Sequence, residues 1–274
     1  MSKIAVIWYW PRASEIFPDW RDGIKAAVEL IGKEHQVEWF LDKQVPQTDD
    51  YDGLIFWDDS NSSFFPQLLN YPKAKKGIFL TSDNGLNIGN LKQLDIVFCE
   101  SKPVLKAVLA GGAKGVLGFG TDTDFYSPDL EVKKDIEYFY PATFSPWKKQ
   151  SNIAYLGDKL VCIGTIQPDG YQELEACEQA GVQIEIGYFP AEKIRDYYRR
   201  AKHVIIPAIH GSERTILEAM ATDILPEVTN LDNVRAQSYL REYYLSQAKS
   251  PRQFILRNYS AKKYAQTILK GLGL

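Results

Sequence analysis

The sequence has few of the residues that metal sites and disulfide frameworks use. It contains three cysteines and three histidines, and neither set shows metal-ligand spacing or a Cys-x-x-Cys pair. An odd number of cysteines without paired spacing argues against a disulfide scaffold and indicates a reduced, cytoplasmic setting. A zinc-type site is therefore not expected.

Long apolar runs and a strong charge imbalance are also missing. No stretch approaches the roughly 20 apolar residues that cross a bilayer, and the opening MSKIAVIWYWPRAS is too short and too aromatic for a signal peptide. We expect no integral membrane segment and only peripheral membrane contact, if any. The net charge of −3 provides no global basic field for nucleic acid.

Three common nucleotide and hydrolase motifs are absent. No Gly-x-Gly-x-x-Gly follows the first predicted strand, and no Gly-x4-Gly-Lys-Ser/Thr occurs, which argues against nicotinamide-dependent enzymes and P-loop NTPases. The lack of a Gly-x-Ser-x-Gly elbow argues against an α/β-hydrolase. No bound cofactor is predicted.

Short β-branched and aromatic runs alternate along the chain with segments of helical periodicity. This alternation is typical of parallel sheets with crossover helices, and 274 residues suffice for two such domains. The polar segment 121–129, TDTDFYSPD, is the natural linker. The predicted strands are 4–8, 36–40, 53–57, 77–81, 95–99, 115–118, 136–140, 160–164, 183–187, 204–207 and 224–226. The predicted helices are 19–31, 103–109, 171–180, 191–200, 213–221, 234–245 and 261–269.

The segment VIIPAIHGSERTILEAMA, residues 204–221, carries the strongest site signal. A buried parallel strand ends at Pro207, a short loop with Gly211 follows, and a helix begins at Ser212 or Glu213. Ligands of open α/β sheets bind beyond the carboxyl ends of strands. Unpaired N–H groups at the helix N-terminus attract anions there.

Side chains in this helix fit a nucleotide ligand. Arg214 and Thr215 lie in the first turn, within reach of a diphosphate, and Glu218 lies one turn further, placed to accept from a ribose. The alternative is structural: Ser212 caps the helix, Glu213 complements its dipole and Arg214 is solvated. The physics alone does not separate these interpretations.

The stretch GSERTILEAMA resembles the donor-binding signature of GT-B glycosyltransferases of the group 1/family 4 type. Those read Glu-x7-Glu and end in Leu-Glu-Ala-Met-Ala, so that Glu218 matches the second Glu, which in the family binds the donor ribose. The first Glu, which lies beside the donor sugar in the family, falls on His210. At this position the sequence departs from the family, because a histidine replaces the acidic residue.

Two more segments carry the resemblance. FGTDTDFYSP, residues 119–128, is similar to the family's linker between domains. IEYFYPATFSPWKK, residues 136–149, is similar to the first strand of the second domain and its Arg-and-Lys loop, which clamps the diphosphate. Lys148 or Lys149 fits the Lys, Thr143 occupies the Arg position, and Arg214 is a candidate to supply the missing charge.

Asp122 and Asp124 also match the Asp-x-Asp metal motif of the other glycosyltransferase fold, GT-A. That motif follows a strand within one nucleotide-binding domain, whereas here a second α/β unit with its own anion-binding helix follows it. We therefore assign both residues to the linker and expect a metal-independent reaction.

Acceptor activation needs a base from the first domain. The candidates follow predicted strands: Asp58 and Asp59 after one, and Asp83 after another. Asp83 precedes Asn-Gly and is equally explained as a turn residue. The aromatic loop of residues 8–12, WYWPR, stands where the family has a Gly-rich loop; it either stacks on an acceptor or caps the sheet.

The resemblance implies a GT-B fold of two facing Rossmann-like domains with parallel sheets. Residues 1–128 form the acceptor domain, 129–258 the nucleotide-sugar domain, and 259–274 a helix that packs back on the first domain. The predicted function is transfer of a sugar from a UDP- or GDP-sugar to a carbohydrate, lipid-linked or other hydroxyl acceptor. Two alternatives stay open: a non-catalytic nucleotide-sugar-binding protein, and a transferase that modifies DNA bases, against which the acidic first domain speaks. Residues 1–128 carry 13 Lys and Arg against 17 Asp and Glu.

Overall fold

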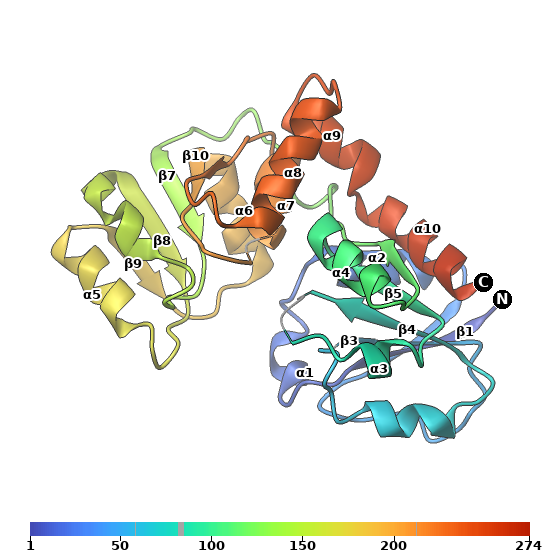
Figure 1. Ribbon diagram of the computed structural model, residues 1–274. Helices are drawn as coiled ribbons and strands as arrows, with labels where there is room; N and C mark the ends of the chain where they lie inside the picture. The colour runs from blue at the N-terminus through green and yellow to red at the C-terminus, as the bar shows by residue number, and fades with distance from the viewer. Residues whose placement is uncertain (58, 82–84, 212) are drawn as a thin grey trace. The chain divides into compact units, whose positions relative to one another are not determined.

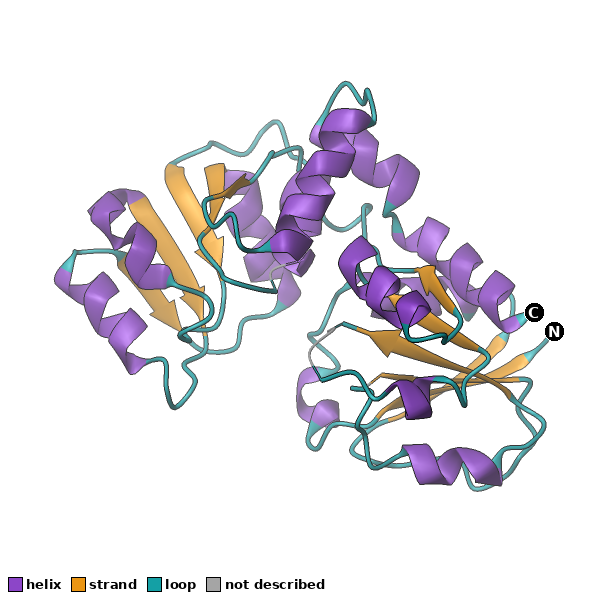
Figure 2. Cartoon of the chain, in the orientation of Figure 1, coloured by secondary structure: helices purple, strands orange, loops and turns teal. Residues whose placement is uncertain are grey.

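The computed structural model describes residues 1–57, 59–81, 85–211 and 213–274. The chain forms two compact units. Unit 1 comprises Met1–Gly120 together with Tyr259–Leu274, and unit 2 comprises Thr121–Asn258. Each unit is an α/β structure with its own parallel sheet (Figures 1 and 2). The division lies between Gly120 and Thr121, whereas the sequence prediction placed it after Pro128.

Unit 1 is built on a six-stranded sheet. Its strands are β1 (Lys3–Trp8), β2 (Gln36–Phe40), β3 (Gly53–Trp57), β4 (Lys75–Leu80), β5 (Ile96–Cys99) and β6 (Gly115–Leu117). Its helices are α1 (Ala13–Ile16), α2 (Gly23–Ile31), the 3-10 helix η1 (Phe65–Asn70), α3 (Ile88–Leu91), α4 (Lys102–Ala110) and α10 (Ala261–Leu272). The strand order is β2-β1-β3-β4-β5-β6, all parallel. The order reverses between β1 and β3, which makes that pair the topological switch point of the sheet.

Apolar patterning explains the central strands and helix α2 of unit 1. Every residue of β3 is buried, as expected for a parallel strand covered on both faces. In α2 the Asp22 carboxylate accepts from the Lys25 N–H at 2.9 Å and so starts the helix. The helix then buries Ile24, Val28 and Ile31 on one face.

The C-terminal helix α10 packs against the first 120 residues, on α2, β4 and β5, as the sequence predicted (Figure 1). Ser260 caps it by accepting from the Lys263 N–H at 3.3 Å. Tyr264, Ile268 and Leu272, each four residues apart, are buried on one face. The Tyr264 ring contacts Phe79 of β4, with centroids 5.7 Å apart. Residues from the end of the chain thus complete the first core.

Unit 2 is built on a five-stranded sheet. Its strands are β7 (Ile136–Pro141), β8 (Leu160–Gly164), β9 (Gln183–Ile186), β10 (Ala201–Ile206) and β11 (Glu227–Val228). Its helices are the 3-10 helix η2 (Gln150–Lys159), α5 (Tyr171–Gln179), α6 (Ala191–Arg200), α7 (Glu213–Ala221), α8 (Val234–Leu245) and α9 (Pro251–Asn258). The order β11-β10-β7-β8-β9 is again fully parallel. Its switch point is the pair β7 and β10.

Two further features concern the whole described chain. All three cysteines, Cys99, Cys162 and Cys177, are buried thiols. Within the described ranges, no helix has the length and apolar character needed to cross a bilayer.

Candidate functional site

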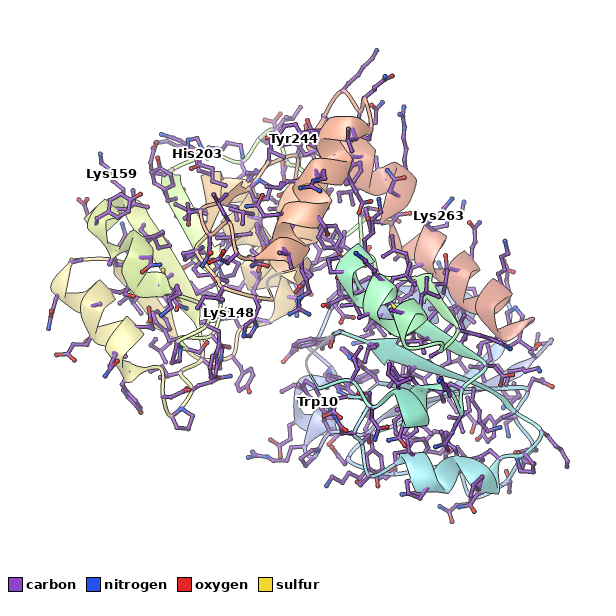
Figure 3. The ribbon with its side chains drawn as sticks, in the orientation of Figure 1. Trp10, Lys148, Lys159, His203, Tyr244 and Lys263 are labelled. Atoms are coloured by element: carbon purple, nitrogen blue, oxygen red, sulfur yellow. The ribbon has the colours of Figure 1, made fainter. Side chains whose placement is uncertain are left out.

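The segments singled out by the sequence meet at the switch point of unit 2. The loop after β7 contains residues 142–149, and the loop after β10 leads through residues 207–211 into α7. Both loops leave carboxyl ends of neighbouring strands. Figure 3 shows Lys148 at this end of the unit, and Lys159 and His203 at the opposite end. This is the location at which open α/β sheets bind ligands.

The loop after β7 is held by backbone bonds to the loop after β8. The Phe144 N–H donates to the Thr165 carbonyl at 2.7 Å, and the Gln167 N–H donates to the Phe144 carbonyl at 3.0 Å. A Cβ at Gly170 would lie 2.0 Å from the Phe144 carbonyl oxygen, so only glycine permits this approach. The Thr143 hydroxyl is bonded to that of Thr165 at 2.9 Å. The loop after β7 is therefore joined to the loop after β8 by two backbone bonds and one bond between hydroxyls.

Lys148 lies at the N-terminus of α7. Gly211 precedes the helix with φ +75°, a left-handed conformation that glycine adopts without strain. A Cβ at Gly211 would lie 2.8 Å from Lys148 Nζ, so the amine packs directly against the glycine. A cation and the positive end of a helix dipole meet here, an arrangement that attracts a phosphate.

Glu213, the first residue of α7, brings a carboxylate close to this amine. Its Oε2 would lie 3.9 Å from the same Gly211 Cβ. Arg235 of α8 compensates this charge, because its Nε lies 3.0 Å from Glu213 Oε1 and both side chains are buried. Arg235 thus balances the negative charge of Glu213. With Lys148 included, the three side chains bring a net charge of +1 to the start of α7.

Arg214 and Glu218 form an ion pair one helical turn apart on α7. Arg214 Nε donates to Glu218 Oε1, and Arg214 Nη2 donates to the Tyr126 hydroxyl at 3.4 Å. The Glu218 side chain is 4% exposed and that of Arg214 27% exposed. The Arg214 side chain is therefore partly open to solvent, whereas the Glu218 carboxylate is buried.

Burial raises the pKa of the Glu218 carboxyl above its ordinary value of 4.5, and three groups oppose that rise. These are the Arg214 guanidinium and the hydroxyls of Tyr126 and Tyr198. Burial, with Glu218 nearby, also raises the pKa of both tyrosines, so they remain neutral donors at physiological pH. Glu218 is held by a preformed set of partners.

His210 lies directly before Gly211 and stacks on Trp147 of the β7 loop. Their ring centroids are 5.9 Å apart with an interplanar angle of 24°. The Ile209 N–H donates to the Trp147 carbonyl at 2.8 Å, which joins the two loops at the switch point. His210 is half-buried and has a fixed position beside the N-terminus of α7.

No protein-family model matches the chain, and no curated protein matches it in sequence. Solved structures match it over its whole length. For Anabaena Alr3699/HepE in complex with UDP and glucose, the TM-score is 0.62 at 13% identity over 100% of both chains. Sucrose-phosphate synthase from Thermosynechococcus elongatus gives 0.67 at 12% identity over 98% of both. A glycosyltransferase from Rickettsia africae ESF-5 gives 0.66 at 12% identity, covering 99% of this chain and 97% of that one.

The chain has the GT-B fold. The predicted fold class, with two parallel-sheet units and a C-terminal helix on the first, is confirmed. The resemblance inferred from GSERTILEAMA is confirmed at the level of fold.

The remaining residues predicted for the donor site are Thr215, Lys149 and Ser212. The Thr215 hydroxyl donates to the Pro141 carbonyl at the end of β7, at 3.4 Å. Lys149 has φ +54° and precedes η2; it follows Lys148 directly, but only Lys148 is seen against Gly211. Ser212 lies outside the described residues.

Of the predicted bases, only Asp59 falls among the described residues. It is exposed, follows β3 in unit 1, and its Oδ1 accepts from the Asn61 N–H at 2.6 Å. Asp58 and Asp83 lie outside the described residues.

The Asp-x-Asp segment forms a turn at the start of unit 2. Asp122 is buried, and its Oδ1 accepts from the N–H groups of Asp124 and Phe125 at 3.2 and 3.1 Å. Arg252 holds the same segment, since its guanidinium donates to the carbonyls of Thr123 and Tyr126 at 3.1 Å each. Among the described residues, no group of three or more His, Cys, Asp or Glu is arranged to hold a metal ion.

The sequence predictions gave no role to Tyr126 and Tyr198, which surround Glu218, or to Arg252, which holds the Asp-x-Asp turn. Tyr126 stood within the quoted linker motif without a role, and Tyr198 sits on α6, where its ring is fully buried. A signal for α9, which carries Arg252, was present: Ser250-Pro251 is a cap followed by proline at the first helical position. Only the tertiary structure reveals the tyrosines' partner.

Proposed function

We propose that the chain is a glycosyltransferase that moves a sugar from a nucleotide diphosphate sugar, a UDP- or GDP-sugar, to a hydroxyl acceptor. The observation that carries the proposal is the Lys148 amine packed against Gly211 at the N-terminus of α7, at the switch point of unit 2. The whole-length match to a structure bound to UDP and glucose supports the choice of ligand class.

Each group at this site has a role in the proposal. Lys148 and the N–H groups that begin α7 bind the diphosphate, with the hydroxyl of Ser212 and, once it turns from the Pro141 carbonyl, that of Thr215 as partners. Arg214, whose side chain is partly exposed, turns its guanidinium from Glu218 to the diphosphate, which leaves the Glu218 carboxylate to accept from the ribose hydroxyls. His210 stands on the sugar side, and Thr143 and Lys149 flank the phosphates.

The reaction then requires a base and a stabilised leaving group. The acceptor oxygen forms a bond to the anomeric carbon, the bond from that carbon to the diphosphate oxygen breaks, and the electron pair leaves with the nucleotide diphosphate. Asp59 or Asp83 of unit 1 takes the hydroxyl proton. Lys148, Arg214 and the α7 dipole stabilise the negative charge that develops on the diphosphate, so that no divalent metal is required.

The proposal assigns the donor to unit 2, the acceptor to unit 1, and the protein to the cytoplasm. The chain's three buried thiols accord with a reducing compartment. Asp122 and Asp124 belong to the turn that opens unit 2 and take no part in the chemistry.

A donor panel tests the function. Thermal unfolding is followed with UDP, GDP, ADP, TDP and CMP and their sugars, because a ligand at 100 times its Kd stabilises by about 2.7 kcal/mol. Release of sugar to water is then measured for the donor that binds. The proposal is supported if the donor binds and sugar release continues both in EDTA and in the Asp122→Asn/Asp124→Asn variant. Binding without any sugar release indicates a non-catalytic nucleotide-sugar-binding protein. If EDTA abolishes sugar release and manganese restores it, the enzyme is metal-dependent.

A further inference from the structure

Four of the six tryptophans gather at the switch point of unit 1. We call Trp8, Trp10, Trp20 and Trp57 the tryptophan cluster. Trp8 ends β1, Trp57 ends β3, and the two residues are direct partners in the strand register. Side chains paired in this way project from the same face of a sheet, and these two indoles stack with centroids 4.5 Å apart and an interplanar angle of 18°.

Trp10 lies over this stacked pair and is open to solvent. Its ring centroid is 6.1 Å from that of Trp8 and 6.4 Å from that of Trp57. Trp8 and Trp57 are 0% and 6% exposed, whereas Trp10 is 47% exposed. The exposed apolar area of the Trp10 ring carries an unfavourable hydration free energy, which burial in the core would remove. Figure 3 shows Trp10 at the same end of unit 1 as α1.

A polar group follows this platform along the chain. The exposed Asp59 carboxylate comes two residues after Trp57. The loop that carries Asp59 is tied to the loop after β4, because the Asn87 N–H donates to the Ser60 hydroxyl at 2.9 Å. An exposed flat apolar ring with a carboxylate in the adjoining loop matches a ligand that has one apolar face and hydroxyls at its edge.

We propose that Trp10 is the stacking platform for the pyranose ring of a carbohydrate acceptor. The inference rests on the proposed function and narrows its acceptor from any hydroxyl compound to a sugar. The axial C–H groups of a pyranose form an apolar, weakly positive face, which is attracted to the negative face of an indole. The Asp59 carboxylate, two residues after Trp57, accepts from a hydroxyl of the pyranose ring.

Two other acceptor classes fit this surface less well. The exposed large apolar side chains in the described part of unit 1 are Met1, Trp10, Leu69 and Leu109. Of these only Trp10 belongs to the tryptophan cluster, in which Trp8 and Trp57 are buried and Trp20 is half-buried. An acyl chain would therefore meet one strongly exposed ring there and not an extended apolar surface. A nucleic acid backbone would meet the excess of acidic residues in 1–128. A sugar ring needs neither an extended apolar surface nor positive charge.

Saturation-transfer NMR of the full chain with cellobiose, lactose and maltose, in the presence of saturating UDP, tests the platform. We expect at least one disaccharide to receive saturation on the C–H face of a single ring. Trp10→Ala should weaken its binding by about ten-fold and Trp10→Phe by about three-fold. Tyr244→Ala is the matched control, since Tyr244 of α8 is 68% exposed and should leave sugar binding unchanged. The Kd for UDP should be unchanged in all three variants.

The outcomes separate this inference from the proposed function. If no disaccharide binds the wild-type chain, or if Trp10→Ala binds as tightly as the wild type, the platform is overturned while UDP binding stands. If Trp10→Ala instead abolishes sedimentation with phosphatidylcholine vesicles or retention of single-stranded DNA, the acceptor belongs to another class and the inference is again overturned. If UDP fails to bind while a sugar binds through Trp10, the proposed function fails and the subsite remains.

Discussion

At the switch point of unit 1 the structure stacks indole rings, and at the switch point of unit 2 it gathers charged groups. Trp8 and Trp57 end their strands in unit 1, whereas Lys148 and Gly211 follow theirs in unit 2. Both sheets are parallel and both reverse their strand order at this point. The same architecture therefore carries stacked indoles at one switch point and charged side chains at the other, and the difference arises from a few residues at or just after the strand ends.

The first prediction, with the largest expected effect, concerns Trp57, the buried indole beneath Trp10 in unit 1. Trp57→Ala deletes a buried indole and should lower the free energy of unfolding of unit 1 by about 4 kcal/mol. Trp57→Phe is the matched control and should cost less, because it keeps a stacked ring. Urea unfolding measures both, and calorimetry should show the UDP affinity of the folded protein unchanged. A loss below about 1 kcal/mol would show that the stack is not part of the core.

The second prediction concerns the buried charge in unit 2. Arg214→Met leaves the Glu218 carboxylate without its cation and should lower the free energy of unfolding by about 3 kcal/mol. Arg214→Met/Glu218→Gln removes the buried charge as well and should recover most of this loss. Equal instability of the single and double variants in urea would contradict the account of the pair as a buried ion pair.

The third prediction separates two neighbouring lysines. Lys148→Ala should weaken UDP binding by about 2 kcal/mol, because a charge-assisted bond to the diphosphate is lost. Lys149→Ala should leave the affinity within about two-fold, since only the Lys148 amine packs against Gly211. Calorimetric titration of both variants with UDP measures the two affinities. Equal losses of affinity would contradict a separate role for Lys148.

The fourth prediction is a pH dependence. Burial raises the pKa of Glu218 above 4.5, so its carboxylate takes up a proton at a higher pH than an exposed glutamate does. As the pH falls through this raised pKa, the carboxylate stops accepting from the ribose, and UDP affinity should fall. Glu218→Gln should lack this step, while the titration of the UDP phosphate persists in both proteins. Parallel pH profiles for the two would contradict a ligand role for the ionised carboxylate.

Local signals in the sequence were enough to predict most of the elements. Helix α7, Glu213–Ala221, follows a strand, proline and glycine, and its bounds were predicted correctly. The helix predicted from residue 19 begins at Gly23, because the Asp22 side chain caps it there. The strand predicted at 224–226 is absent. Ile224 instead donates its N–H to the Ala219 carbonyl at 2.9 Å and is buried against the end of α7, so β11 begins at Glu227.

Elements without periodic patterning were missed. Helix η2 contains Gly157 at φ +57°, which interrupts any helical pattern, and Gln150 at its start donates to the carbonyls of Ala142 and Thr143. Of the residues predicted for the donor site, Lys148 lies against Gly211 just before α7, and Arg214 and Glu218 pair on α7. The pairing of Arg214 with Glu218 was signalled by their four-residue spacing, whereas the contact with Tyr126 joins residues 88 positions apart and depends on the tertiary fold.

The measurement that tests the difference between the two switch points most directly is hydrogen exchange with and without UDP, followed by mass spectrometry of peptides. UDP should slow exchange in peptides covering residues 142–150 and 207–218, because the diphosphate accepts from the N–H groups at the start of α7. Peptides covering residues 3–12 and 53–57, around the tryptophan cluster, should exchange at unchanged rates. Protection confined to the unit 1 peptides, with none at the start of α7, would contradict the assignment of the nucleotide site to unit 2.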